Sequence, residues 1–216
     1  MNRQLPLLII LIVLLVAAGA GFWFYRTTRP ETPSTAMPAA TVAPPPANGS
    51  APRSVVTIEE YGDYQCPPCG ILHPDLKKLK QEYGERIRFV FHHFPLTQIH
   101  KNAQAAALAA VAAGYQGRFW EMHNLLYENQ PGWSEAPDLL PIVSNFARQL
   151  GLDIDRFVDD MGSARAAAVV ASDFQQGIAR GVNATPTLII NGQIIPTENM
   201  APDKLRQEIN RQLGAR

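Results

Sequence analysis

The sequence has little cysteine and no excess of charge of either sign. Its two cysteines, Cys66 and Cys69, are separated by only two residues. A disulfide across so short a loop adds little stability, because disulfides stabilise chiefly by closing long loops of the unfolded chain. The pair is therefore reactive, metal-binding or incidental rather than structural. Basic and acidic residues number 19 each, so no overall field favours nucleic acid or a strongly charged partner.

One long apolar run is present, and it lies at the N-terminus. Leu5 to Tyr25 contains no charged residue. At about 1.5 Å per residue, a helix of this length spans one hydrocarbon core of roughly 30 Å. The alternative is a cleaved signal peptide with Ala18-Gly19-Ala20 as its cleavage site. We expect an uncleaved anchor over residues 1–26, because the apolar run continues past Ala20 into aromatic residues typical of a membrane interface.

Proline is concentrated in the segment that follows. Residues 27–53 hold seven prolines among alanine, threonine and serine, which predicts a semi-extended linker without a core. From residue 54 onward, apolar residues recur at strand and helix spacing. Residues 54–216 are therefore predicted to form one folded domain.

The predicted order of elements in this domain is strand, helix, strand, helical block, hairpin and helix. Strands over Val55–Tyr61 and Arg86–Phe94 flank a helix that runs from Cys66 to Gly84, which predicts a βαβ unit with parallel strands. The hairpin turns at Asn191-Gly192, a dipeptide preferred in two-residue turns. It pairs Thr187–Ile190 with Gln193–Ile195, and the last helix covers Pro202–Leu213.

The block from about Gln98 to Gly181 is too long for a connection. We predict that it is an inserted helical subdomain, so the fold class is α/β with a helical insert. Its predicted helices are Asn102–Ala113, Phe119–Asn129, Asp138–Leu150, Ile154–Met161 and Ala164–Arg180.

The motif Cys66-Pro67-Pro68-Cys69 follows a strand and opens a helix. Unpaired N–H groups and the positive end of the helix dipole favour the thiolate of Cys66 there. Pro67 and Pro68 fit the first turn, where an N–H has no helical partner to lose, but they cannot donate to the thiolate. Cys66 is expected to be the exposed attacking cysteine, with a pKa between about 3.5 and about 8.5. Cys69 is placed to resolve the mixed disulfide.

Four segments in order resemble the DsbA-like branch of the thioredoxin superfamily. Pro74, shortly after the second cysteine, resembles the kink of that fold's active-site helix. The resemblance runs from about Val55 to the C-terminus and implies a thioredoxin fold. The matching segments are Glu60 to Cys69, His93-Phe94-Pro95-Leu96, Phe119-Trp120-Glu121-Met122-His123, and Gly181 to Thr187.

The resemblance also implies roles for residues outside the cysteine pair. Pro186 is expected to follow a cis bond beside the first cysteine, and with Thr185 to shape the groove where a substrate strand docks. Glu60 matches a buried acid that would accept the proton of the resolving cysteine. Glu59 stands at a position that is usually apolar in this family, so either carboxylate could face the cysteines.

The expected function is formation of disulfides in extracytoplasmic proteins. The resemblance implies reduced or unfolded secreted proteins as substrates and reoxidation by a membrane redox partner of DsbB or VKOR type. No cofactor is expected beyond the Cys66–Cys69 disulfide, and no nucleic acid. We expect a monomer on its own membrane helix, with its domain in the periplasm or outside the cell membrane, because cytosolic thiol pools keep dithiols reduced. A disulfide reductase or isomerase is the alternative.

A metal-binding or redox-inactive binding module is the second class of function. The candidate ligands are Cys66, Cys69 and His73, with His92, His93 or His123 as the fourth. A helix of the thioredoxin type turns His73 away from the sulfur atoms, and the kink at Pro74 fits redox use. We therefore expect no metal site.

Overall fold

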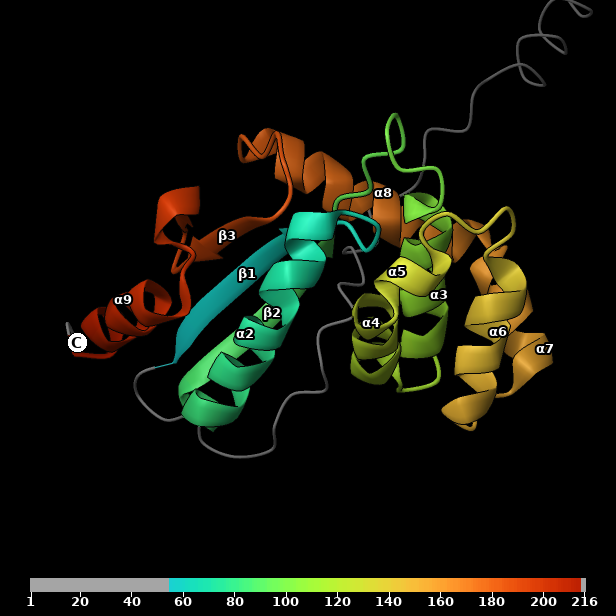
Figure 1. Ribbon diagram of the computed structural model, residues 1–216, viewed down its shortest axis with the longest axis horizontal. Coiled ribbons are helices and arrows are strands. Elements are labelled where there is room, and N and C mark those ends of the chain that lie inside the picture. Colours follow the sequence, from blue (N-terminus) through green and yellow to red (C-terminus); the bar gives the residue numbers. More distant parts are fainter. Residues whose placement is uncertain (1–54, 215–216) are drawn as a thin grey trace, which may run out of the picture. The chain divides into compact units, whose positions relative to one another are not determined.

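The structure is a computed structural model that describes residues 55–214 (Figure 1). The predicted anchor over residues 1–26 and the predicted linker over residues 27–53 lie outside the described residues. Within residues 55–214, no helix has both the length and the apolar character needed to cross a membrane.

A four-stranded mixed sheet forms the centre of the domain. Its order is β2-β1-β3-β4, where β1 is Val56–Gly62, β2 is Ile87–His93, β3 is Thr187–Ile190 and β4 is Gln193–Ile195. β1 and β2 are parallel, β3 is antiparallel to β1, and β4 pairs back on β3. Both residues of the Asn191-Gly192 turn have positive φ, 47° and 83°, as a tight hairpin requires. The predicted parallel pair and hairpin are confirmed.

Helix α2, Pro67–Tyr83, connects β1 to β2 and packs on the sheet with α9, Pro202–Gly214. Its residues at helical spacing, Leu72, Leu76, Leu79 and Tyr83, are all buried. They join apolar residues of the sheet and of α9 in one hydrophobic cluster. Gly84 ends the helix with φ 53°, a conformation that glycine adopts without the steric penalty of a side chain.

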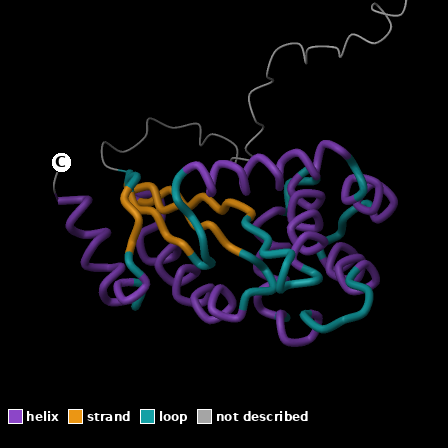
Figure 2. Tube along the Cα trace, turned by 90° about the horizontal axis from the view of Figure 1, so that it is seen from above, coloured by secondary structure: helices purple, strands orange, loops and turns teal. Residues whose placement is uncertain are grey.

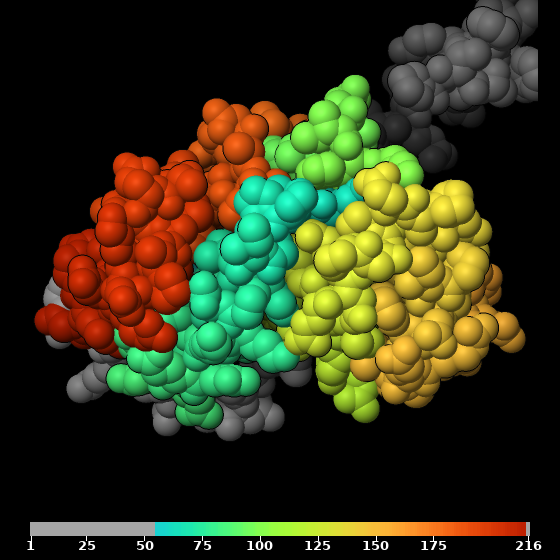
Figure 3. Space-filling view, viewed as in Figure 1, coloured from blue at the N-terminus to red at the C-terminus, as the bar shows by residue number. Residues whose placement is uncertain are grey.

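The helical insert lies beside the sheet and packs against α2 (Figures 1 and 3). Five of its helices were predicted, and each is confirmed within two residues at both ends. Buried alanines on every side of the first of them allow its neighbours to approach closely. These helices are α3 (Ala103–Gly114), α4 (Phe119–Glu128), α6 (Leu140–Gln149), α7 (Ile154–Met161) and α8 (Ala164–Ala179).

The short helix α5, Gln130–Trp133, was not predicted. Pro131 and Gly132 in its middle are typical of a turn. The helix forms because Trp133 is completely buried in the core of the insert and donates its indole N–H to the carbonyl of Leu126 at 2.7 Å. Tertiary packing therefore determines this element.

Helix α8 fastens the insert to the sheet, and Figure 2 shows it as a long helix over the strands. The Asp173 carboxylate accepts the backbone N–H of His93 at 3.0 Å and contacts the His92 ring at 3.4 Å. Gly177 allows the close approach, since a Cβ added there would lie 2.7 Å from Phe94 and 2.9 Å from Tyr61. These contacts hold the end of α8 against the sheet. They therefore also fix the start of the loop that leads from α8 to β3.

Candidate active site

Cys66 is the N-cap residue of α2, with Pro67 and Pro68 in the first turn. The two prolines have no N–H, so Cys69 carries the first N–H of the helix. The N–H of Cys69 lies 3.1 Å from the carbonyl of Cys66. The Cys66 thiol donates to the carbonyl of Thr185, with a distance of 3.4 Å from the sulfur to the oxygen. The sequence motif and the loop before β3 therefore meet at one sulfur atom.

The prediction that Cys66 is exposed is wrong. Only 5% of Cys66 is exposed, and none of Cys69. The loop at Thr185 covers the Cys66 sulfur, although the two residues lie 119 positions apart in the sequence. The sequence alone therefore does not show that this sulfur is buried. Cys66 nevertheless remains the more accessible of the two, so an attacking disulfide or thiol reaches it first.

The two thiols differ in acidity. The pKa of Cys66 falls to about 6, chiefly because the Cys69 thiol hydrogen-bonds to it, with further help from the Thr185 side chain and the N–H of Cys69. Burial opposes these effects. The pKa of Cys69 is raised well above its ordinary value, first by burial and then by its partner sulfur and Glu60. One cysteine is therefore a thiolate at neutral pH while the other keeps its proton.

The peptide bond between Thr185 and Pro186 is cis, as the resemblance implies. The Thr185 hydroxyl has no hydrogen-bond partner among the described residues. It contributes to lowering the pKa of Cys66. This hydroxyl is therefore available to a thiolate.

Glu59 and Glu60 point to opposite faces of the sheet, as neighbours in a strand must. Glu60 is 1% exposed, and burial followed by the charge of Cys66 raises its pKa to about 8. Glu59 instead accepts from Arg180 at 3.0 Å and contacts His92 at 3.2 Å. Glu60 is thus the carboxyl group coupled to the cysteines. Glu59 lies on the other face of the sheet, in the contact between the sheet and the end of α8.

A hydrogen-bond network from the insert holds the active-site loop, and this network was not predicted. Gln130 of α5 donates to the carbonyls of Tyr64 at 2.7 Å and Cys66 at 2.9 Å. The side chain of Gln65 accepts the N–H of Asn102 at 2.7 Å. No local sequence signal indicates these pairings, because the partners lie 37 to 66 residues apart.

Asp63 is the second unpredicted residue of this loop. It is 1% exposed, and its carboxylate accepts from the backbone N–H groups of Gln65 at 2.8 Å and Leu96 at 2.9 Å. The His100 ring lies 2.7 Å from the same carboxylate. These three partners satisfy the carboxylate, as burial of a charged group requires. In the sequence, the only sign of this role was the position of Asp63 within the segment that precedes Cys66.

The candidate metal ligands do not converge. Among residues 55–214, no group of three or more His, Cys, Asp or Glu side chains could hold a metal ion. His73 packs against Tyr127 and His123, with ring centroids 5.1 and 5.2 Å away. His93 is buried, which lowers its pKa to about 4.

Comparison with known proteins gives one family over most of the chain. A sequence model described as thioredoxin matches residues 47–211. Two proteins named Na⁺/H⁺ antiporter NhaA 1 are also similar. The one from Salinispora arenicola is 44% identical over 138 residues, which are 64% of this chain and 20% of that protein. The one from Mycolicibacterium gilvum is 35% identical over 146 residues, 66% of this chain and 22% of that protein. The chain thus spans about a fifth of the length of these relatives.

Solved structures share the fold. A thioredoxin-like oxidoreductase from Silicibacter pomeroyi superposes with a TM-score of 0.60 at 25% identity, over 74% of this chain and 90% of that one. BdbD from Bacillus subtilis superposes with a TM-score of 0.65 at 23% identity, over 74% and 88% of the two chains. The thioredoxin-like fold with its helical insert is common to these proteins.

Proposed function

The chain belongs to the thioredoxin family, and on this premise we propose that it is a thiol–disulfide oxidoreductase that works through Cys66 and Cys69. The observation that carries the proposal is the difference between the two thiols. The pKa of Cys66 falls to about 6 at the helix N-terminus, whereas burial keeps Cys69 protonated. A thiolate beside a protonated partner is the arrangement that two-step disulfide exchange requires.

The proposed direction is oxidation of client thiols. A client thiolate attacks the Cys66 sulfur of the oxidised protein, the Cys66–Cys69 bond breaks, and Cys69 leaves with the electron pair. Protonated Glu60 supplies the proton that Cys69 takes up. A second client thiolate then attacks the mixed disulfide and releases Cys66 as a thiolate. Stabilising that thiolate stabilises the reduced protein, and this makes the disulfide oxidising.

Thr185 and Pro186 are proposed to bind the client strand beside Cys66. Pro186 has no N–H, so an extended client segment can approach the sulfur without meeting a donor there. The remaining backbone of this loop offers hydrogen bonds to a client strand, as in other strand-addition complexes. Reduced secreted proteins are the proposed clients.

The proposed location is outside the cytoplasm, with the domain tethered by the apolar segment over Leu5 to Tyr25. Reoxidation passes two electrons to a membrane redox partner of DsbB or VKOR type, and the chain acts as a monomer without a cofactor. A reporter that is active only in the cytosol, fused after Arg216, should be inactive. An active reporter would contradict this topology.

The reduction potential tests the direction of electron flow. The protein is equilibrated with reduced and oxidised glutathione, and the fraction of oxidised Cys66–Cys69 is measured. We expect a potential clearly above the thioredoxin value of roughly −270 mV. A potential near that value would instead favour a disulfide reductase, the alternative within the enzyme class.

The antiport activity in the relatives' names is not proposed for this chain. The similarity covers only about a fifth of those proteins.

A further inference from the structure

The buried acid Glu60 is almost completely shielded from solvent. It is 1% exposed, and one of its carboxyl oxygens has no hydrogen-bond partner among the described residues. Burial raises its pKa to about 8, so Glu60 already holds a proton at neutral pH. Before it can accept the proton of Cys69 it must release its own, and this release needs a path.

A small cavity leads from Glu60 toward the surface between α2 and α4. Its volume is about 260 Å³, and its walls include Glu60, His73, Lys80 and His123. One water occupies roughly 30 Å³ in the liquid, so the cavity has room for several waters. Its lining is mostly apolar, but Glu60, His73, Lys80 and His123 supply the hydrogen-bond partners that buried waters need.

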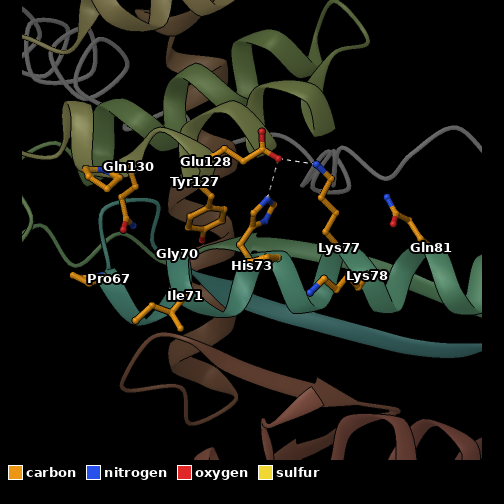
Figure 4. Close-up of a pocket in the computed structure, with 12 residues that line it drawn as sticks. Pro67, Gly70, Ile71, His73, Lys77, Lys78, Gln81, Tyr127, Glu128 and Gln130 are labelled. Atoms are coloured by element: carbon orange, nitrogen blue, oxygen red, sulfur yellow. Dashed lines mark hydrogen bonds and ion pairs between the residues drawn. The ribbon is translucent and has the colours of Figure 1, made fainter. Parts of the chain in front are cut away.

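His73 lies on the wall between this cavity and a larger open groove. The groove has a volume of about 740 Å³ and is lined by residues of α2, α4 and α5, with His73 among them (Figure 4). His73 is 5% exposed, and its Nε2 has no hydrogen-bond partner among the described residues. Nε2 lies 4.0 Å from the Glu128 carboxylate, which in turn accepts from Lys77 at 2.6 Å.

Glu128 and Lys77 open this end of the path to water, because their side chains are 45% and 43% exposed. Burial lowers the pKa of His73, while the charge of Glu128 partly offsets this effect and Lys77 adds to it. The imidazole is therefore neutral in its resting state and can take up a proton on one side and release it on the other.

Lys77 also lines the cavity, but its ammonium group is paired with Glu128 at 2.6 Å. The remaining basic groups of the cavity are less suited to this transfer. His123 lies deeper, its Nδ1 contacts the Tyr64 hydroxyl at 3.1 Å, and burial lowers its pKa far below the ordinary value. Lys80 stands over the Trp120 ring at 3.8 Å. Several titratable groups surround His73. They are Glu60 from β1, Lys77, Lys78 and Lys80 from α2, and His123, Tyr127 and Glu128 from α4.

We propose that His73 is a proton-relay residue, which passes the proton of Glu60 through the cavity to Glu128 and the solvent of the groove. The inference rests on the proposed exchange function. In the reoxidation step, Glu60 loses its proton to His73, the Cys69 thiol gives its proton to Glu60, and the Cys69 thiolate attacks the Cys66 sulfur. The electron pair of the broken mixed disulfide leaves with the partner thiolate.

The test follows the mixed disulfide between Cys66 and glutathione. The reduced full chain is mixed with oxidised glutathione, and samples are quenched with acid at intervals. Mass spectrometry then measures the fraction of protein that carries glutathione in each sample. The change His73→Phe should slow the attack of Cys69 at least about tenfold near neutral pH, less than the roughly 10²–10⁴-fold of a complete loss of general acid–base catalysis, because water in the cavity can replace part of the relay. The difference in rate between His73→Phe and the wild type should become smaller above the Glu60 pKa of about 8, because Glu60 is then already ionised. Added imidazole should restore part of the rate.

The matched control is His93→Phe. His93 is also a buried histidine with an unpartnered ring nitrogen, but it does not line the cavity. Its variant should resolve the mixed disulfide at the wild-type rate. Equal slowing in both variants, or no slowing in His73→Phe, would overturn the relay.

A second variant tests the same relay if His73→Phe fails to fold. Glu128 is half-exposed, so Glu128→Gln should fold and should show a smaller deficit with the same dependence on pH. An unchanged rate in Glu128→Gln would then overturn the relay. Failure of the wild type to form any mixed disulfide would instead contradict the proposed function, and so the two failures are distinguishable.

Discussion

At the scale of single residues, the hydrogen bond between the two thiols makes the largest contribution to the acidity of Cys66. Removing that donor with Cys69→Ala should raise the pKa of Cys66 from about 6 toward the ordinary value of 9.0. Cys69→Ser keeps a donor and should raise the pKa less. Ultraviolet absorbance of the thiolate, followed during a pH titration, measures both values. Identical titrations of wild type and Cys69→Ala would contradict this account.

The same serine variant tests the order of attack. Cys69→Ser cannot resolve a mixed disulfide, so it should accumulate disulfide-linked clients through Cys66. The corresponding change at Cys66 should trap none, because Cys69 is completely buried. Trapping that required Cys69 and tolerated loss of Cys66 would reverse the assignment.

The neighbouring carboxylates of β1 should affect stability in opposite ways as pH changes. The pKa of Glu60 in the reduced protein is raised to about 8 from 4.5. The unfolded chain therefore loses this proton first, and stability falls as pH rises from 4.5 through 8. The loss is at most about 5 kcal/mol. The pKa of Glu59 is lowered, mainly by Arg180 against the effect of burial, so its contribution is present above 4.5 and lost in acid.

Denaturant unfolding of Glu60→Gln and Glu59→Gln at about pH 5 and about pH 9 checks this pair. Relative to wild type, Glu60→Gln should gain stability as pH rises, whereas Glu59→Gln should lose it. Parallel trends in the two variants would show that burial of Glu60 does not control its ionisation.

At the scale of elements, local pattern was sufficient where a helix or strand carries its own periodicity. The five predicted insert helices and the hairpin were of this kind. The pattern could not decide between Glu59 and Glu60, because alternation separates the two faces of β1 without saying which face meets α2. It also missed α5, whose proline and glycine are outweighed by the burial of Trp133.

Helix α8 depends on a glycine for its contact with the sheet. Gly177→Ala should destabilise the protein, because a Cβ would lie 2.7 Å from Phe94. Overpacking of this kind costs about 1–3 kcal/mol, which exceeds the roughly 1 kcal/mol that alanine adds in a helix. Gly132→Ala in α5 is the control, since a Cβ there has nothing within 4 Å. Thermal unfolding should show a lower midpoint for the first variant and no loss for the second.

At the scale of the whole molecule, the active site is built from three separated parts of the chain. The sequence placed the cysteine motif, Glu60 and the loop of Thr185 and Pro186 in one site, and the structure brings them together. It did not indicate that the insert holds the same loop, because Gln130 and Asn102 carry no motif. Contacts between such distant residues depend on the completed fold rather than on local pattern.

Gln130 of the insert acts as a clamp on the active-site loop through its two hydrogen bonds. Gln130 is 8% exposed and donates to the carbonyls of both Tyr64 and Cys66. Gln130→Met keeps the length of the side chain but leaves buried carbonyl oxygens without this donor, which costs about 1–3 kcal/mol. The control is Gln116→Met. Gln116 also makes two hydrogen bonds to backbone, at 3.0 and 2.9 Å to Asp153, but it does so at the surface.

Water replaces the partners of Gln116, so Gln116→Met should lose much less stability in denaturant unfolding. Gln130→Met should also change the thiolate titration of Cys66, because the clamp fixes the backbone that starts α2. A loss of stability without any change in that titration would show that the insert only supports the fold. A change in both, absent from the control, would show that the helical insert sets the reactivity of a cysteine 64 residues away.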